Sequence, residues 1–244
     1  LPMLQLVENA LRHADRTAVR ADGRTYNYQT LLDTSASLAH LLLDSAPDLA
    51  EARVAFVVAP GFDYVRVQWG IWRAGGVAVA LSYPPPSLRY VLGDTGATIV
   101  VADPAHAPAM APLAAEKGLR LLVLGEEAAA PGTERLPTLA PSRRAMILYT
   151  SGTTSLPKGV AITHGNLHAQ ISVLVREWGW SADDQILCVL PLHHVHGMVN
   201  VVSCALWAGA VVEFPPQFSA EAIFRVFLEG DTNVFMAVPT IYFR

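Results

Sequence analysis

The stretch 145–160, Ala-Met-Ile-Leu-Tyr-Thr-Ser-Gly-Thr-Thr-Ser-Leu-Pro-Lys-Gly-Val, sets the interpretation of this chain. An apolar, strand-like segment runs into six residues that carry five hydroxyl side chains and one glycine. Such a loop offers backbone N–H groups and hydroxyls to a polyphosphate, and the lysine after it adds a positive charge. The stretch therefore predicts a nucleotide-phosphate loop. Its members are Thr150, Ser151, Gly152, Thr153, Thr154, Ser155 and Lys158.

This loop is not of the Walker A type. A Walker A loop has glycine, four residues, and then glycine and lysine, but counting from Gly152 puts Pro157 where the second glycine belongs. Hydroxyl content alone fits an ordinary Ser/Thr-rich surface loop equally well.

The pattern Tyr-Thr-Ser-Gly-Thr-Thr-x-x-Pro-Lys-Gly-Val resembles the AMP-binding signature of the adenylate-forming superfamily, with Ser155 where that family usually has glycine. The resemblance implies an acid–thiol ligase that uses ATP, Mg²⁺ and coenzyme A. It also implies that residues 150–155 and Lys158 hold the β- and γ-phosphates, with Lys158 as a catalytic residue. Magnesium would sit on phosphate oxygens, through Thr153 or Thr154.

The rest of the chain alternates short apolar segments with amphipathic ones. A β-hairpin is expected around Asp22-Gly23. Strand–helix alternation with continuously apolar strands predicts an α/β fold with mainly parallel sheets flanked by helices. The expected strands are 54–59, 77–81, 98–101, 119–124, 145–149, 160–163, 186–190, 210–214 and 233–238. The expected helices are 3–13, 29–43, 62–74, 87–94, 105–117, 164–178, 198–207 and 219–228.

Residues 126–143 lack periodicity and are rich in Ala, Pro and Gly, which predicts a linker. It would divide a first α/β subdomain, 1–125, from a second segment, 144–244, that carries the phosphate loop. The resemblance covers nearly the whole chain but only part of the family pattern: the Tyr-Gly-x-Thr-Glu motif and the C-terminal lid domain do not occur in the sequence. We therefore expect the N-terminal part of such an enzyme, with little or no activity alone.

A second candidate site is the run Leu190-Pro-Leu-His-His-Val-His-Gly197, with three histidines after an apolar strand. Ligands of parallel sheets bind beyond the carboxyl ends of the strands. The histidines could hold zinc with Cys188 or Cys204, begin a helix, or form the polar end of an acid pocket.

The pattern Leu-Pro-x-x-His-x-x-Gly resembles the superfamily motif whose histidine, His194 here, lines the acyl pocket and is counted as catalytic. The string His-His-Val-His-Gly-Met-Val-Asn is similar to the malonyl-CoA synthetase group. A second imidazole, His196, suits a substrate with a distal carboxylate. The expected substrate contacts are His194, His196, Met198, Met236 and Val238.

Composition bears on nucleic-acid binding, membrane spans and cellular location. The chain has 244 residues, 52% of them hydrophobic, and a net charge of −4, which gives no basic field for nucleic acid. No segment has the length of a membrane span, and two apolar-flanked cysteines indicate a reducing compartment. The cytoplasm is the expected location, with the mitochondrial matrix as the alternative.

The predicted function is an acid–CoA ligase acting on malonate or a similar short dicarboxylate. The alternatives are a medium-chain or aromatic acyl-CoA synthetase or adenylation domain, and a non-catalytic nucleotide-binding fragment. The expected partners are small molecules, and surfaces exposed by truncation could support self-association.

Overall fold

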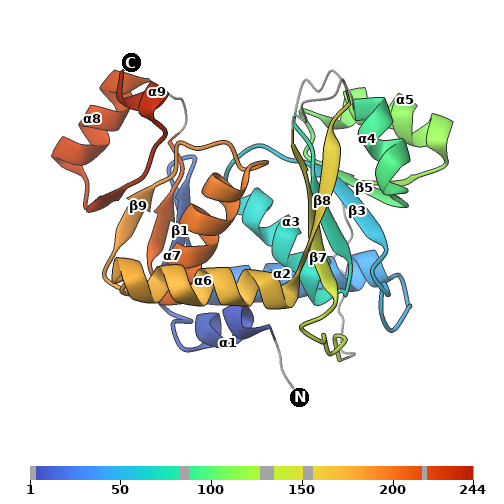
Figure 1. The fold of residues 1–244 in the computed structure, drawn as a ribbon, viewed down its shortest axis with the longest axis horizontal. Helices are drawn as coiled ribbons and strands as arrows, with labels where there is room; N and C mark the ends of the chain where they lie inside the picture. Colours follow the sequence, from blue (N-terminus) through green and yellow to red (C-terminus); the bar gives the residue numbers. More distant parts are fainter. Residues whose placement is uncertain (1–3, 83–87, 127–134, 151–155, 216–218, 244) are drawn as a thin grey trace. The chain divides into compact units, whose positions relative to one another are not determined.

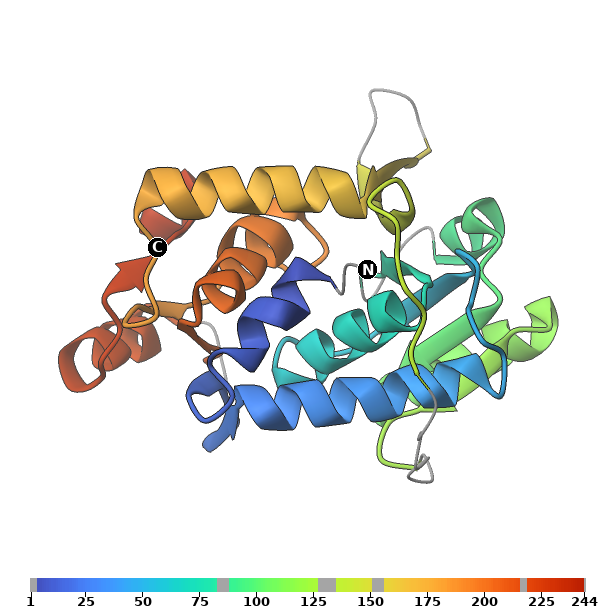
Figure 2. The same cartoon turned by 90° about the horizontal axis from the view of Figure 1, so that it is seen from below.

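The computed structural model describes residues 4–82, 88–126, 135–150, 156–215 and 219–243 (Figures 1 and 2). The chain forms two compact units. Unit 1 comprises Asp33–Ala59 and Asp63–Asn166. Unit 2 comprises Met3–Leu32, Pro60–Phe62 and Leu167–Arg244. Each unit has its own β-sheet, and the two sheets share no strand among the described residues.

The sheet of unit 1 has six strands among the described residues, in the order β6-β5-β3-β4-β7-β8. All neighbours are parallel except β7 and β8, which form an antiparallel hairpin. The strands are β3 (Arg53–Val57), β4 (Val77–Ala80), β5 (Ile99–Ala102), β6 (Arg120–Val123), β7 (Arg144–Thr150) and β8 (Lys158–Thr163). The helices are α2 (Tyr28–Leu43), α3 (Phe62–Arg73), α4 (Leu88–Thr95) and α5 (Ala107–Lys117); the first residues of α2 and of α3 belong to unit 2.

The central strands of unit 1 are short and apolar because both faces are covered. Every residue of β4 and β5 is buried, as expected for a parallel sheet between helices. Helices α4 and α5 lie on one side of the sheet (Figure 1) and close a core with β3, β4 and β5. Its buried members are Ala55, Val57, Val79, Leu88, Val91, Leu92, Ala97, Val100, Ala102 and Met110.

Helix α3 carries the predicted apolar stripe, with Val65, Trp69 and Trp72 all buried. The Trp72 indole N–H donates a hydrogen bond of 2.8 Å to the Ala145 carbonyl in β7, so its polar atom is satisfied inside the core. These tryptophans serve packing.

The sheet of unit 2 has the order β11-β9-β10-β1-β2, five strands among the described residues. The pair β1 (Thr17–Ala21) and β2 (Arg24–Asn27) is antiparallel, and β10, β9 and β11 follow in parallel. Asp22 and Gly23 both have positive φ, 51° and 70°, as the predicted hairpin turn requires. The other strands are β9 (Gln185–Leu187), β10 (Val211–Glu213) and β11 (Val234–Phe235). The helices are α1 (Gln5–Leu11), α6 (His164–Trp178), the π-helix η1 (His196–Ser203), α7 (Cys204–Ala208), α8 (Ala220–Glu229) and α9 (Pro239–Tyr242), α6 beginning in unit 1.

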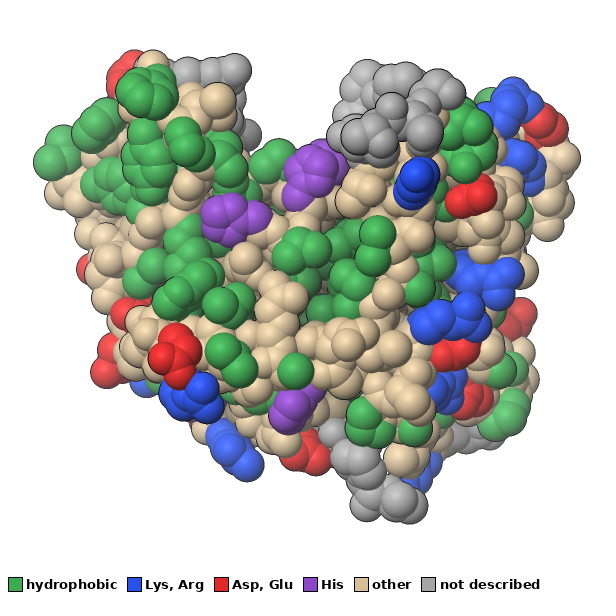
Figure 3. Space-filling model, in the orientation of Figure 1, with side chains coloured by type: hydrophobic (Ala, Val, Ile, Leu, Met, Phe, Trp, Pro, Cys, Tyr) green, Lys and Arg blue, Asp and Glu red, His purple; other side chains and the backbone are tan. Residues whose placement is uncertain are grey.

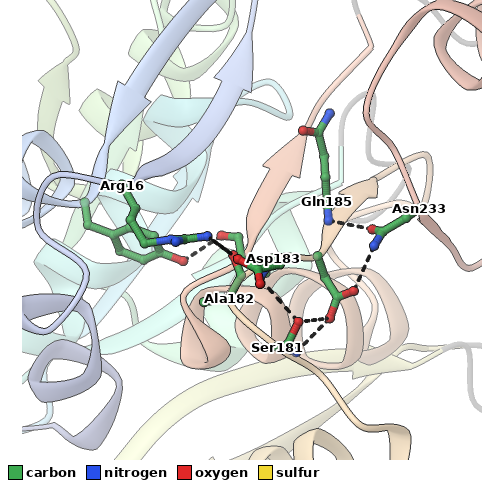
Figure 4. Close-up of polar contacts among 9 residues, drawn as sticks. Arg16, Ser181, Ala182, Asp183, Gln185 and Asn233 are labelled. Carbon is green, nitrogen blue, oxygen red and sulfur yellow. Dashed lines mark hydrogen bonds and ion pairs between the residues drawn. The ribbon is translucent and has the colours of Figure 1, made fainter.

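A polar network holds the start of β9 in place (Figure 4). Asp184 accepts from the Ser181 backbone N–H (2.7 Å) and hydroxyl (3.1 Å), and from the Asn233 amide (3.0 Å). The Gln185 N–H in turn donates to the Asn233 side chain at 2.8 Å. Arg16 reaches the same turn through Asp183 at 3.1 Å. The network therefore ties the loop before β9 to the segment that leads into β11.

The structure confirms the predicted fold class: two mainly parallel sheets flanked by helices. The predicted division at residues 126–143 differs from the observed grouping. The hairpin β7–β8 pairs with β4 of unit 1, and β1 pairs with β10 of unit 2, because parallel pairing joins segments far apart in sequence. Residues 135–143 contain no helix or strand, and 127–134 lie outside the described residues. Within the described residues, no helix is both long and apolar enough to cross a membrane.

Candidate active site

The phosphate-loop candidate is framed by the hairpin β7–β8. Thr150, the last residue of β7, and Lys158, the first residue of β8, are cross-strand partners. The Thr150 hydroxyl donates to the Lys158 carbonyl oxygen at 3.5 Å. Both residues are exposed. The predicted loop members Ser151, Gly152, Thr153, Thr154 and Ser155 lie outside the described residues.

Gly159 follows Lys158 on the same strand, and side chains of the facing strand leave little room for a β-carbon on it. A β-carbon at this position would lie 3.0 Å from Ile147 Cγ2 and 3.2 Å from Tyr149 Cζ, both on the facing strand. Because glycine has no side chain, the large side chains of Ile147 and Tyr149 can pack against this position. The sequence signature contains this glycine, and the structure supplies its physical reason.

The helix that follows the hairpin begins with reciprocal side-chain caps. The Asn166 N–H donates to the Thr163 hydroxyl at 3.1 Å, while the Thr163 N–H donates to the Asn166 side-chain oxygen at 3.0 Å. This is the arrangement of a capping box. Between them, His164 is buried, and burial together with the charge of Arg143 lowers its pKa to about 4.

The histidine run follows β9 in unit 2, and its last histidine, His196, is the first residue of η1. His194 is exposed, while His193 and His196 are partly buried. The rings of His193 and His194 are 4.3 Å apart between centroids, and burial lowers the pKa of His193, with a smaller effect of His194. Histidine side chains are among those exposed on the face drawn in Figure 3. At neutral pH this cluster offers imidazoles that accept or donate hydrogen bonds, which suits a polar ligand.

Gly197 fixes how η1 leaves the histidine run. A β-carbon there would lie 2.6 Å from the Pro191 carbonyl oxygen and 3.2 Å from Leu190 Cβ. Only glycine lets the helix start this close to the preceding turn. The helix then continues with π-type geometry, in which the Ser203 hydroxyl donates to the Met198 carbonyl at 2.9 Å. A helix was predicted from 198 to 207, but its earlier start and its π-helical first half were not.

The predicted pocket walls differ in exposure. Met198 is fully buried within η1, Met236 is partly buried, and Val238 is 39% exposed. Asn200, the last residue of the string quoted above, was given no role from sequence; it accepts a hydrogen bond of 2.7 Å from Gln170 of α6. Strand β11 ends at Phe235, so Met236 and Val238 lie beyond it, at the carboxyl end where ligands of parallel sheets bind.

The zinc alternative for this region finds no support. Cys188 and Cys204 are buried, and burial raises the pKa of each thiol to about 12. Among the described residues, no group of three or more His, Cys, Asp and Glu side chains is arranged to hold a metal ion.

These features define the class of the protein. The family model described as "AMP-binding enzyme" matches residues 6–244, so the chain belongs to this enzyme family.

The similar proteins include malonate–CoA ligases. The chain is 42% identical over 249 residues to the mitochondrial malonate–CoA ligase ACSF3 of Homo sapiens, covering 96% of this chain and 43% of the human protein. It is 33% identical to a malonate–CoA ligase of Arabidopsis thaliana, covering 96% of this chain and 45% of that protein. The chain therefore spans less than half of these curated relatives. ATP-bound MatB from Rhodopseudomonas palustris superposes with a TM-score of 0.86 at 27% identity, over 99% of this chain and 50% of that one.

Proposed function

We propose that this chain is part of an ATP-dependent acid–CoA ligase that acts on malonate or a similar short dicarboxylate. The observation that carries the proposal is the phosphate-loop signature on hairpin β7–β8, where Thr150 and Lys158 face each other at the two ends of the loop. The family match and the ATP-bound structural relative support the use of ATP.

The proposed reaction has two steps. In the first, an oxygen of the acid's carboxylate bonds to the α-phosphorus of ATP, and the bond to the leaving pyrophosphate breaks. In the second, the sulfur of coenzyme A bonds to the acyl carbon, and AMP leaves with the electron pair of the broken C–O bond. The work of the protein in the first step is positioning and charge neutralisation.

Lys158 is the described residue suited to that work. Its ammonium group is exposed at the first residue of β8, where it can approach a phosphate as a mobile point charge. The predicted magnesium contacts, Thr153 and Thr154, lie outside the described residues, and the proposal routes no step through the metal. Coenzyme A as the thiol follows from the names of the similar proteins.

The proposed acid site uses His194 and His196. An exposed imidazole and a partly buried one, two positions apart, give a dicarboxylate hydrogen-bond donors that a fatty acid would not need. The malonate–CoA ligases among the relatives support this substrate class. With an apolar side chain in place of His196, the site should favour a monocarboxylate of similar length.

Calorimetric titration of malonate into the chain with excess ATP tests this assignment. We expect malonate to bind and butyrate to bind much more weakly, and His196→Leu to weaken malonate about tenfold, the effect of losing one hydrogen bond to a charged group. The control His40→Leu removes an imidazole from the last turn of helix α2, in the part of that helix that belongs to unit 1. Equal binding of malonate and butyrate would instead support the medium-chain or aromatic alternative.

A second test concerns the activity of this chain alone. We propose that the chain alone forms little or no AMP from ATP, malonate and coenzyme A. AMP formation at ordinary turnover rates would contradict that statement, and absence of ATP binding would contradict the proposed function itself.

Location and association are also proposals. The vertebrate relatives are named mitochondrial proteins, which supports the matrix alternative over the predicted cytoplasm. Hydrophobic side chains gather over α8 and α9 (Figure 3), and their exposed members are Phe224, Leu228, Tyr242 and Phe243. Self-association through this surface stays a prediction.

A further inference from the structure

Tyr149, the residue before the phosphate loop, makes a contact that no part of the signature indicates. Its hydroxyl donates a hydrogen bond of 2.5 Å to the Asp94 carboxylate on helix α4. The two residues are 55 positions apart in the sequence. Burial, the hydrogen bond and the Asp94 charge all raise the pKa of Tyr149, so the hydroxyl remains a donor at neutral pH.

The Tyr149 ring in turn lies against the strand that carries Lys158. Tyr149 and Gly159 are cross-strand partners, and the ring atom Cζ and the hydroxyl oxygen lie 3.2 and 3.3 Å from the site of a β-carbon on Gly159. The ring therefore lies close to Gly159, directly after Lys158, on the side where a side chain would project. The Tyr149 side chain is held at its hydroxyl by Asp94, and its ring packs against Gly159. This packing restricts the backbone at Gly159.

Helix α4 is a firm base for this contact. Its buried residues Leu88, Val91, Leu92 and Thr95 pack into the core of unit 1, while Asp94 is exposed on the helix surface. Tyr90, one turn earlier, is packed against the same core and donates a weaker hydrogen bond to Asp94, at 3.4 Å. Asp94 thus accepts hydrogen bonds from two tyrosines, and the helix that carries it is anchored by its buried residues in the core of unit 1.

We propose that Asp94 is a positioning residue for Lys158, acting through the Tyr149 ring. The proposal rests on the proposed function, since it assigns Lys158 to the β- and γ-phosphates of ATP. Asp94 itself touches no substrate. The hydrogen bond from Tyr149 to Asp94 holds the Tyr149 ring in place, and the ring restricts the backbone at Gly159. Because Lys158 is the preceding residue, its side chain is then oriented toward the β- and γ-phosphates.

The test compares ATP and AMP affinities of the unaltered chain with those of Asp94→Ala, Tyr149→Phe and Asp94→Asn. The first two variants lose the hydrogen bond, and we expect ATP to bind about threefold to tenfold more weakly. AMP lacks the β- and γ-phosphates, so its affinity should change less than about twofold. Asp94→Asn keeps an acceptor oxygen for the Tyr149 hydroxyl, so this variant should retain most of the ATP affinity of the unaltered chain. Equal loss of ATP and AMP affinity would show a merely structural contact and overturn the proposal.

Two matched controls isolate the contact. Tyr90→Phe removes only the weaker hydrogen bond to Asp94, and Glu116→Ala removes the ion pair between α5 and Arg89 of α4. Neither should change ATP affinity by more than about twofold. A change as large as that of Asp94→Ala would mean that any disturbance of α4 has the same effect, which contradicts the specific role of Asp94.

Amide hydrogen exchange tests the positioning without any ligand. In Asp94→Ala, the N–H groups of Gly159 and Val160 should exchange several-fold faster than in Tyr90→Phe, because the Tyr149 ring is released. If the unaltered chain binds no ATP, the proposed function is contradicted while exchange still decides the positioning. Unchanged exchange at both amides would overturn the proposal.

Discussion

His164 should make the stability of this protein depend on pH between about 4 and 6.5. The residue begins α6 directly after β8, its backbone N–H donates to the Arg143 carbonyl at 2.9 Å, and its ring meets Trp72 edge-on at 6.2 Å between centroids. It is only 9% exposed. Burial and the charge of Arg143 lower its pKa from about 6.5 to about 4, so the folded state favours the neutral imidazole.

The sign and the size follow from that shift. Between these two pKa values the unfolded chain binds a proton that the folded chain does not, so stability rises with pH and is lost as pH falls from 6.5 toward 4. At about 1.36 kcal/mol per pKa unit, the contribution lost relative to pH 7.5 is about 2 kcal/mol at pH 5 and about 3 kcal/mol at pH 4. Above pH 7.5 the effect is absent.

The assay is urea unfolding of the unaltered chain and of His164→Asn at pH 7.5 and pH 5. Taking the difference between the two pH values removes any cost of the substitution that does not depend on pH. The unaltered chain should lose about 2 kcal/mol more than the variant on acidification. The control His168→Gln changes an exposed imidazole on the same helix and should leave the loss unchanged.

Other groups add to the loss at lower pH but are common to both proteins. Hydrogen bonds from Arg143 and Arg144 lower the pKa of Asp48 and of Glu51, respectively. A lowered carboxylate pKa contributes stability that is present above its ordinary value and is lost as pH falls through the folded value. The difference between the chains therefore isolates His164. An equal loss in the unaltered chain and in His164→Asn would refute the reasoning.

Three further substitutions test individual contacts by urea unfolding. Gly197→Ala should destabilise the protein by about 1–3 kcal/mol, because its β-carbon would lie 2.6 Å from the Pro191 carbonyl, whereas Gly93→Ala, with only Lys117 Nζ at 3.5 Å, should be neutral or stabilising. Tyr28→Phe should cost about 1–3 kcal/mol, since the buried hydroxyl donates to the Ala210 carbonyl at 2.7 Å, and an unchanged midpoint would contradict that role. Ser219→Ala should lower the free energy of unfolding by about 1 kcal/mol, because the Ser219 hydroxyl caps α8 by accepting from the Ala222 N–H at 3.1 Å. Ser219→Asp keeps a capping oxygen and should retain the stability of the unaltered chain.

Local chemistry explains what the sequence could predict of the fold. The turn at Asp22-Gly23, the buried stripe of α3 and the caps Thr163, Asn166 and Ser219 each depend on residues close together in the chain. The grouping of strands does not. Pairing of β1 with β10, and of β4 with β7, joins distant segments, and periodicity carries no information on such partners.

In the candidate site, too, the features set by neighbouring residues could be predicted and those set by distant contacts could not. The signature residues could be read directly, whereas the contact between Tyr149 and Asp94 depends on how α4 packs beside the sheet. The hydrogen bond between Gln170 and Asn200 and the π-helical start of η1 were also beyond prediction. A π-helix has the same apolar composition as the α-helix that was expected, and its extra residue per turn leaves no distinct pattern.

The most direct test of the central claim is calorimetric titration of ATP into this chain and into Lys158→Ala, each with and without malonate. Lys158 is exposed, so the substitution should leave the free energy of unfolding within about 0.5 kcal/mol. We predict that the unaltered chain binds ATP, that malonate tightens this binding, and that Lys158→Ala weakens it at least about tenfold. ATP affinity that is equal in both chains and indifferent to malonate would contradict the claim that hairpin β7–β8 carries the nucleotide site of an acid–CoA ligase.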